Sequence, residues 1–388
     1  MITPPFSKII LNLRGFPFVL YIVHRLNAAS MGLFLRVATC LCMASLAWGH
    51  RSRGFLADMD RREAAKLTVQ QFKLDYVTSG RPVIIRNDPS ALALSYALTL
   101  DAVLSMCGDK RPRMDNHFVD VIKWGIKWGI SPEMTKAVTE RLNYTDGVNF
   151  EDAIAELTGL GTTKTLSDYI EGPFFKNPVK TAQDPRFPGS LKDWSHPADY
   201  MWPPSVYGWQ MGHCPVLVMR VRQLLGADVD GYTTEGITGI PYVRALMTDE
   251  EKHRRHRPAG HMMYMYASGD KVRGPPPHVH RHPNHSVMLV LRGTKRIVTW
   301  PSQQRERLYP IEFGEVGMLN DHFMANAFDV NLTAQPDLRD AIGGLQGEAG
   351  VGDLIYLPCG AVHAFESVGS TMALAWRRVE AVECPTRT

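Results

Sequence analysis

The sequence predicts an α+β protein with a mainly helical front half and a β-sandwich or β-barrel in its back half. From residue 259 onward, evenly spaced β-type runs alternate with turns, at 261–267, 287–291, 296–300, 354–357 and 372–376. Before that point apolar residues recur at helical spacing, as in 55–74 and 99–106, and one short apolar strand is expected at 82–86. We therefore divide the chain after its first 49 residues into a mainly helical part, 50–258, and a barrel core, 259–384.

The bulk composition is that of an ordinary globular protein. The chain has 388 residues, of which 45 % are hydrophobic and 21 % are charged. A formal net charge of +4 is too small to indicate nucleic-acid binding, so no nucleic-acid partner is expected. The sharpest basic run, 252–257, is typical of a solvated loop, with an anion site as the alternative reading.

Residues 1–49 are expected to be a signal peptide or a membrane anchor. A short basic head from Met31 to Arg36 precedes an apolar run at 37–47 and then small residues. The run is shorter than the ~20 residues that cross a bilayer. Two main readings stay open: Met31 is the true start of a secretory leader, or 1–48 is an uncleaved anchor. A buried internal helix is a third. The first places the protein in the secretory pathway, in the ER or Golgi lumen or outside the cell, and a membrane is expected as a partner only in the second.

Four cysteines follow this segment, at positions 107, 214, 359 and 384. They fit an oxidising compartment, and the sequence does not choose among their three pairings. Cys359 lies four residues before His363, so it is either a metal ligand or reactive thiol, or a packing residue or half of a disulfide.

A histidine cluster is the main chemical signal. His278, His280 and His282 alternate after three prolines, so in an extended segment their side chains would point to one face. Imidazoles at this spacing can take neighbouring positions around a metal. The distant His363, which follows a turn, a strand and a second turn, is the candidate for a further ligand. A pair from one strand and a single histidine from another would hold a metal between two strands of a barrel. Histidines that merely decorate an exposed loop are the alternative.

Three motifs together carry a family resemblance. They are His280-Arg-His282 ahead of a strand, Gly293-Thr-Lys295 opening an apolar run that ends at Pro301, and Gly352-Asp353 through His363. With these the chain resembles the JmjC/cupin-like family of Fe(II)- and 2-oxoglutarate-dependent oxygenases over about residues 67–380. The resemblance implies a double-stranded β-helix, the jelly-roll or cupin barrel. It also implies a hydroxylase that uses Fe(II) and 2-oxoglutarate on an unidentified protein or small-molecule substrate.

The resemblance also assigns roles to single residues. His280 and His363 would be metal ligands, and His282 stands where the family has its carboxylate ligand. The pair His278 and His280, shifted by two residues, is the alternative register. Lys295 would pair with the distal carboxylate of 2-oxoglutarate, a charge-assisted contact.

Two more residues are expected near the co-substrate. Ser286 stands where the family commonly has an asparagine. Tyr264, or its neighbour Tyr266, is expected to face the pocket from a predicted strand, with core packing as the alternative. Pro277 replaces a hydroxyl that often helps to hold the co-substrate. Together with His282, these departures leave two other functions open: a catalytically inactive cupin-like binding domain, and a three-histidine metal dioxygenase that does not use 2-oxoglutarate.

Overall fold

The computed structural model describes residues 6–13, 16–23, 56–112, 114–115, 165–176, 205–225, 239–246, 263–280, 284–310 and 322–377. The chain divides into two compact units, Met1–Phe55 and Leu56–Thr388. In the first unit, β1 (Phe6–Leu13) and β2 (Phe16–Val23) form an antiparallel hairpin. Residues 31–48, on which the predicted leader depends, lie outside the described residues, so the leader stays a prediction.

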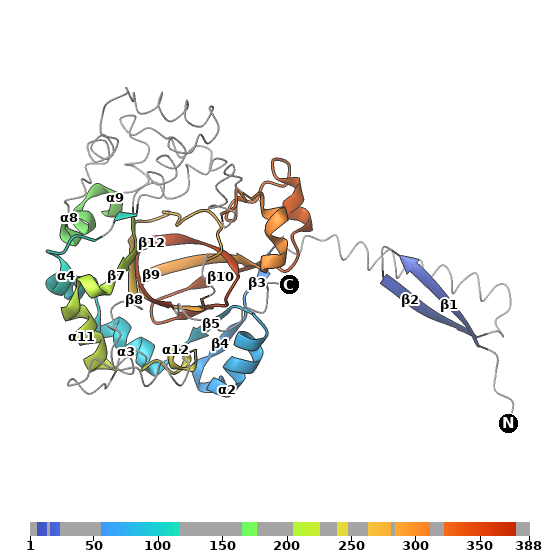
Figure 1. The fold of residues 1–388 in the computed structure, drawn as a ribbon, viewed down its shortest axis with the longest axis horizontal. Coiled ribbons are helices and arrows are strands. Elements are labelled where there is room, and N and C mark those ends of the chain that lie inside the picture. The colour runs from blue at the N-terminus through green and yellow to red at the C-terminus, as the bar shows by residue number, and fades with distance from the viewer. Residues whose placement is uncertain are drawn as a thin grey trace, which may run out of the picture. The chain divides into compact units, whose positions relative to one another are not determined.

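The second unit has mixed α/β content around one curled, ten-stranded sheet that forms a half-barrel (Figure 1). The expected combination of helices with a barrel-like sheet is thereby confirmed at this level. Eight strands follow the order β4-β5-β11-β9-β12-β8-β7-β6, and β10 joins β9 to β3 beside them. The pairs β4–β5 and β3–β10 are parallel, and the others are antiparallel. The strands are β3 (Ala57–Asp58), β4 (Arg61–Glu63), β5 (Val83–Arg86), β6 (Met114–Asp115), β7 (Ser205–Gln210), β8 (Met263–Ser268), β9 (Ser286–Trp300), β10 (Leu345–Ala349), β11 (Leu354–Leu357) and β12 (Val362–Arg377).

Among the described residues, every α-helix lies before residue 247 and only 3-10 helices follow. The front part also supplies β3 to β7 to the sheet. No single described helix is long and apolar enough to cross a bilayer, and only the bent pair α3–α4 passes by length and composition. The helices are α2 (Val69–Phe72), α3 (Pro89–Ala97), α4 (Leu100–Cys107), α8 (Leu166–Glu171), α9 (Pro173–Lys176), α11 (Pro215–Leu224) and α12 (Pro241–Ala245), with 3-10 helices η1 (Ala64–Lys66), η4 (Met211–His213), η7 (Ser302–Leu308) and η9 (Pro336–Asp340), and a π-helix η2 (Lys73–Thr78).

The prediction of a helix over residues 55–74 is wrong for the first half of that range. Residues 57–63 form β3 and β4, which pair with β10 and β5. The helical spacing of Leu56 and Met59 arises because both side chains are buried among sheet residues. The helix begins only at α2, where Thr68 and Gln71 form a capping box that satisfies the first backbone N–H groups.

The sheet has two apolar faces, because successive side chains of a strand point to opposite sides. In β11, Leu354 and Tyr356 belong to the larger core that includes the helices, while Ile355 and Leu357 belong to a smaller core on the other face. We call the face with the smaller core the inner face. Its buried apolar residues are Met59, Ile84, Tyr266, Met288, Val290, Ile297, Ala349, Ile355, Leu357, Ala373 and Ala375.

The alternation in β9 changes phase at Gly293. Before this residue Val290 lies on the inner face, opposite Ala373. After it Ile297 lies on the inner face, opposite Phe365. Gly293 has φ +69°, and a Cβ there would lie 2.5 Å from the Ser370 carbonyl oxygen. The pairing of β9 with β12 shifts register at this point, between Val368 and Ala373, so a β-bulge interrupts the ladder and the two runs expected at 287–291 and 296–300 are one bent strand.

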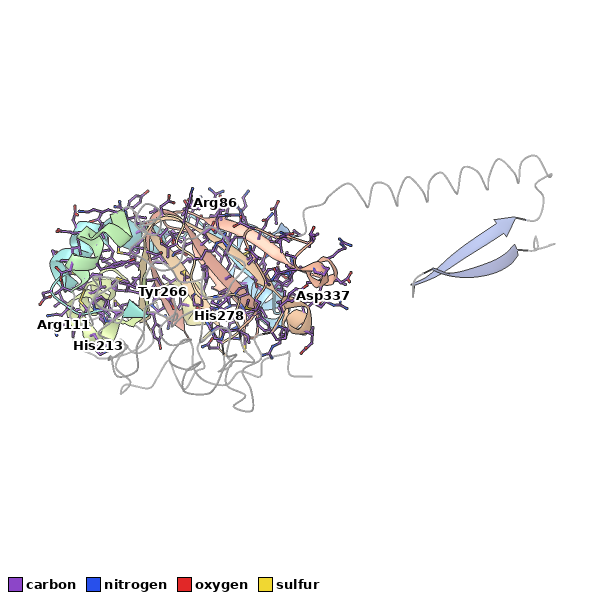
Figure 2. All side chains as sticks on the ribbon, turned by 90° about the horizontal axis from the view of Figure 1, so that it is seen from above. Arg86, Arg111, His213, Tyr266, His278 and Asp337 are labelled. Atoms are coloured by element: carbon purple, nitrogen blue, oxygen red, sulfur yellow. A yellow bond between two sulfur atoms is a disulfide. The ribbon has the colours of Figure 1, made fainter. Side chains whose placement is uncertain are left out.

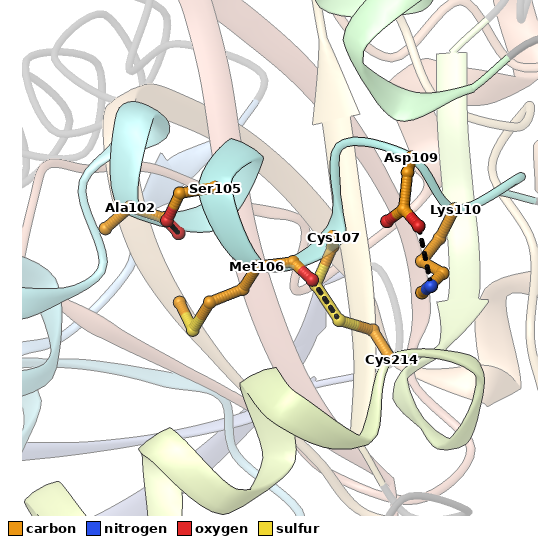
Figure 3. Close-up of a disulfide and its surroundings, with 7 residues drawn as sticks. All are labelled: Ala102, Ser105, Met106, Cys107, Asp109, Lys110 and Cys214. Carbon is orange, nitrogen blue, oxygen red and sulfur yellow. Dashed lines mark hydrogen bonds and ion pairs between the residues drawn. A yellow bond between two sulfur atoms is a disulfide. The ribbon is translucent and has the colours of Figure 1, made fainter.

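A disulfide joins Cys107, at the end of α4, to Cys214, directly before α11 (Figure 3). Cys359 is also disulfide-bonded. Cys359 is therefore half of a disulfide, and its reading as a metal ligand or reactive thiol is wrong.

Removing the Cys107–Cys214 bond is expected to lower the free energy of unfolding by about 2–5 kcal/mol, because the bond closes a long loop in the unfolded chain. The variant that carries both Cys107→Ser and Cys214→Ser tests this by urea denaturation monitored by circular dichroism. A change below about 0.5 kcal/mol, the size of an ordinary surface substitution, would contradict the prediction.

Candidate metal centre

Three histidines place their ligand nitrogens within 4.8 Å of one another: His278, His280 and His363. His363 lies on β12, and the other two lie in the extended segment that pairs with it. The His278 N–H donates to the His363 carbonyl at 3.0 Å, and the His363 N–H donates back at 2.9 Å. Figure 2 shows His278 in the sheet part of the unit, away from Arg111 and His213 at its helical end. Backbone pairing therefore brings together residues that are 85 positions apart.

An oxygen acceptor orients each of the three rings. The Nδ1 atoms lie next to the Pro276 carbonyl at 3.0 Å for His278, the Ala361 carbonyl at 3.0 Å for His363 and Asn284 Oδ1 at 2.6 Å for His280. Because these oxygens only accept, Nδ1 is assigned the proton in each ring, and Nε2 carries the lone pair that can bind a metal. In metal-binding histidines, the ring nitrogen that does not bind the metal usually donates its N–H to an acceptor of this kind.

The donor set fits a divalent transition metal. Burial, followed by the neighbouring rings of His363, His322 and His280, holds the pKa of His278 well below its ordinary value. His278 is therefore neutral at neutral pH, which is the form that a metal requires. Imidazoles suit iron, zinc, copper and nickel, and three of them leave coordination positions for other ligands.

Replacing Asn284 with alanine is expected to weaken metal binding by about 10–100-fold, because His280 loses the acceptor that fixes its ring and tautomer. The measurement is a titration of the full chain with Co(II), followed by visible absorption. Asn284→Asp keeps an acceptor oxygen and serves as the matched control, with an affinity close to that of the unchanged chain. Equal affinities for the alanine variant and the control would contradict the role of Asn284.

A buried lysine lies elsewhere on the inner face. Lys295 is 6 % exposed, and its Nζ donates to Ser268 Oγ at 3.0 Å and Ser367 Oγ at 2.9 Å. These two hydroxyls also bond to each other and to Thr371. No carboxylate of the described residues pairs with Lys295, and burial lowers its pKa to about 7. An anion that reached this ammonium would restore its charge and supply the missing counter-ion.

The lysine and the histidines share one face of the β9–β12 pair. Lys295 lies opposite Ser367, and Thr299 lies opposite His363. Four residues separate these pairs, so their backbones are about 13 Å apart along the strands. Ile297 and Phe365 lie between them. The sheet therefore carries, on one partly apolar wall, three histidines that could hold a metal and a buried lysine that could receive an anion.

The structure places most of the site residues predicted from the sequence. It brings His280 and His363 together, and their described partner is His278, the alternative ligand. His282 lies outside the described residues. Ser286 is 5 % exposed at the start of β9 and falls on the inner row. Tyr264 and Tyr266 both lie on the inner row of β8.

Sequence reasoning missed Asn284 and the three hydroxyls around Lys295. Ser367 lies four residues after His363, so the period of two in a strand would have placed it on the same face. Ser268 comes from β8, and nothing in the sequence indicates that β8 pairs with β12.

A scan against protein-family models gives no match, and a search of the curated proteins gives none either.

Proposed function

We propose that this chain is an Fe(II)- and 2-oxoglutarate-dependent oxygenase of the JmjC/cupin type, which hydroxylates a protein side chain or a small molecule. His278, His280 and His363 would hold the metal. The observation that carries the proposal is Lys295, a buried ammonium whose partners among the described residues are all hydroxyls, on the same face as the three histidines. We further propose that the curled sheet is the double-stranded β-helix of that family.

The spacing of the two groups supports this co-substrate. The distal carboxylate of 2-oxoglutarate would bind Lys295, with Ser268 and Ser367 as additional donors. The oxo-acid end would face His363, whose backbone position lies ~13 Å along the strands from that of Lys295 on the same face.

The charges are also complementary. Three neutral imidazoles leave both positive charges of Fe(II) unbalanced, and protonated Lys295 adds a third. A dianion that bridges the two groups would neutralise most of this charge in a setting where water screens it weakly.

The chain's own side chains would orient the reactants and exclude water. The histidines fix the metal, and Lys295 fixes the far end of the co-substrate. Ile297 and Phe365 form the apolar wall between them, and Ser286 and Tyr264 lie on the same inner rows. When bound, Fe(II) and 2-oxoglutarate supply the oxidising power that inserts one oxygen atom of O₂ into a substrate C–H bond, with succinate and CO₂ as by-products.

A three-histidine dioxygenase that does not use 2-oxoglutarate is the second candidate. It is favoured by the all-imidazole donor set and by the pKa of about 7 for Lys295, which leaves much of that side chain neutral at physiological pH. For this candidate, Lys295→Met would leave activity intact.

The deciding experiment is an anaerobic optical titration of the full chain, first with Fe(II) and then with 2-oxoglutarate. We expect a visible charge-transfer band only when both are present, and its loss in His280→Ala. Tight Fe(II) binding without the band would favour the second candidate. No metal binding at all would refute both candidate functions and leave a catalytically inactive cupin-like binding domain.

We also propose that the protein belongs to the secretory pathway. The support is the Cys107–Cys214 disulfide, since such bonds form and persist in oxidising compartments. Immunofluorescence with an ER marker checks this, and a cytosolic signal with reduced cysteines would refute it.

A further inference from the structure

The segment that carries His278 lies between β12 and a third stretch of chain, residues 322–329. On one side, Gly274 N–H donates to Phe365 O at 2.8 Å, in line with the paired backbones of His278 and His363. On the other side, Phe323 N–H donates to Pro277 O at 2.8 Å. The His278 and His322 rings stack at 5.4 Å with 15° between their planes. The position of His278 therefore depends on both flanking segments.

One buried guanidinium joins these three parts of the chain. The side chain of Arg273 is 3 % exposed, and its Nε donates to Glu366 Oε2 at 2.9 Å. Its Nη1 donates to Asn326 Oδ1 at 3.3 Å, and its Nη2 forms an ion pair with Asp329. Arg273 is five residues before His278, and Glu366 is three residues after His363. The same cation thus links both ligand-bearing segments to residues 322–329.

A second arginine completes this ion-pair cluster. The other carboxylate oxygen of Glu366 accepts from Arg296 Nη1 at 2.5 Å. Both guanidinium groups lie over the Phe328 ring, at 5.4 Å for Arg273 and 5.5 Å for Arg296. Two guanidinium groups that share one carboxylate and one aromatic ring hold a fixed geometry better than a single exposed ion pair does.

The cluster lies on the opposite face from the proposed chemistry. Glu366 lies between Phe365 and Ser367 on β12, and those two residues point to the inner face. The arginine cluster would therefore act on the metal through the backbone, without touching metal or co-substrate.

We propose that Arg273 is a positioning residue for the metal centre, which keeps His278 in register with His363. This inference rests on the metal site of the proposed function. Without the guanidinium, residues 322–329 lose the bonds that join them through Arg273 to Glu366 of β12, and among the described residues Glu366 keeps Arg296 as its ion-pair partner. The expected result is a shift of His278 relative to the other two ligands. Even a small shift of this kind matters for a metal, which tolerates only small errors in ligand distance.

A purely structural role would lower stability and leave the geometry of the folded site unchanged. The test therefore compares two destabilised proteins, the Arg273→Gln variant and the Cys107→Ser/Cys214→Ser variant, whose lost bond is at the helical end of the unit. The full chains are titrated with Co(II) at a temperature where circular dichroism shows both to be folded. The readouts are the dissociation constant and the visible d–d spectrum, which reports coordination geometry.

We expect Arg273→Gln to raise the Co(II) dissociation constant about 10–100-fold, the size seen when outer partners of metal ligands are lost, and to change the spectrum. The disulfide control should keep the affinity and the spectrum of the unchanged chain. If Arg273→Gln does not fold, Glu366→Gln, which keeps the shape of the side chain, is measured in its place with the same expectation.

Two results would overturn the proposal. If the arginine or glutamate variant binds Co(II) with unchanged affinity and spectrum, the cluster only stabilises the fold and the metal centre itself stands. If the unchanged chain does not bind Co(II), the metal centre is refuted and the positioning role with it.

Discussion

Replacing His278 with alanine is expected to abolish tight binding of Fe(II) or Co(II). His278 would supply one of three neutral nitrogens, and its Nδ1 is already held by the Pro276 carbonyl. If the three ligands share a total binding free energy of ~10–16 kcal/mol, losing one weakens binding on the order of a thousandfold. The measurement is a competition titration against a chelator of known affinity, at pH 7.5 and under argon.

Two control variants make this result specific. His213→Ala removes an exposed histidine at the helical end and should leave the affinity unchanged. His282→Ala separates the two registers, because the family resemblance puts the third ligand at 282 while the described geometry puts it at 278. We expect the His282 variant to keep its metal. Loss of metal in His282→Ala with retention in His278→Ala would reverse the ligand assignment.

Replacing Lys295 with methionine is expected to remove 2-oxoglutarate binding while Fe(II) binding persists. The lysine is the one charged partner available to the distal carboxylate among the described inner-face residues, and methionine keeps a similar length without the charge. Truncating one member of a buried charge pair costs about 2–5 kcal/mol, which is roughly 30- to several-thousand-fold in affinity. Isothermal titration of the anaerobic Fe(II) form checks this, and unchanged affinity would refute the role of Lys295.

The same lysine sets a pH dependence of co-substrate binding. Its pKa of about 7 means that the free site loses its positive charge above neutrality, so 2-oxoglutarate must bind together with a proton. The affinity should therefore fall with rising pH, approaching about tenfold per pH unit above pH 8. The Lys295→Met variant should show no such slope, and an equal slope in both proteins would assign the proton to another group.

The stability of the fold should rise with increasing pH, whereas the affinity for the co-substrate falls. The folded pKa of Lys295 is lowered from 10.5 to about 7, so between these values the unfolded chain binds a proton that the folded chain does not. The contribution of Lys295 to stability thus rises as the pH increases from 7 toward 10.5. Urea unfolding of both proteins at several pH values should show this rise only in the chain that keeps the lysine. A parallel response would mean that Lys295 keeps its ordinary pKa.

The residues of the candidate metal centre were easier to predict than the sheet that holds them. His280, His363 and Lys295 were predicted because closely spaced histidines, and a lysine directly after a glycine turn, are patterns that can be recognised within a short stretch of sequence. The sequence could not decide whether His278 or His282 is the third candidate ligand, because alternation puts both side chains on the same side of an extended segment. In the structure the pairing of His278 with β12 brings it to the site.

Long-range pairing explains the remaining differences. Residues 57–63 have helical apolar spacing, yet they form strands because β10 and β5 offer backbone partners. The disulfide between Cys107 and Cys214 depends on α4 meeting α11, which no local pattern reveals. The arginine cluster around Glu366 likewise joins residues from three distant stretches, each ordinary when considered alone.

The bulge beside Gly293 decides which of two neighbouring cations faces the proposed co-substrate site. In a β9 that alternated regularly from end to end, Met288 and Val290 would stay on the inner face, but Lys295 would turn to the opposite side and Arg296 would take its place. A local irregularity of the backbone thus places a buried, titratable ammonium in the site instead of a guanidinium whose charge no change of pH would remove.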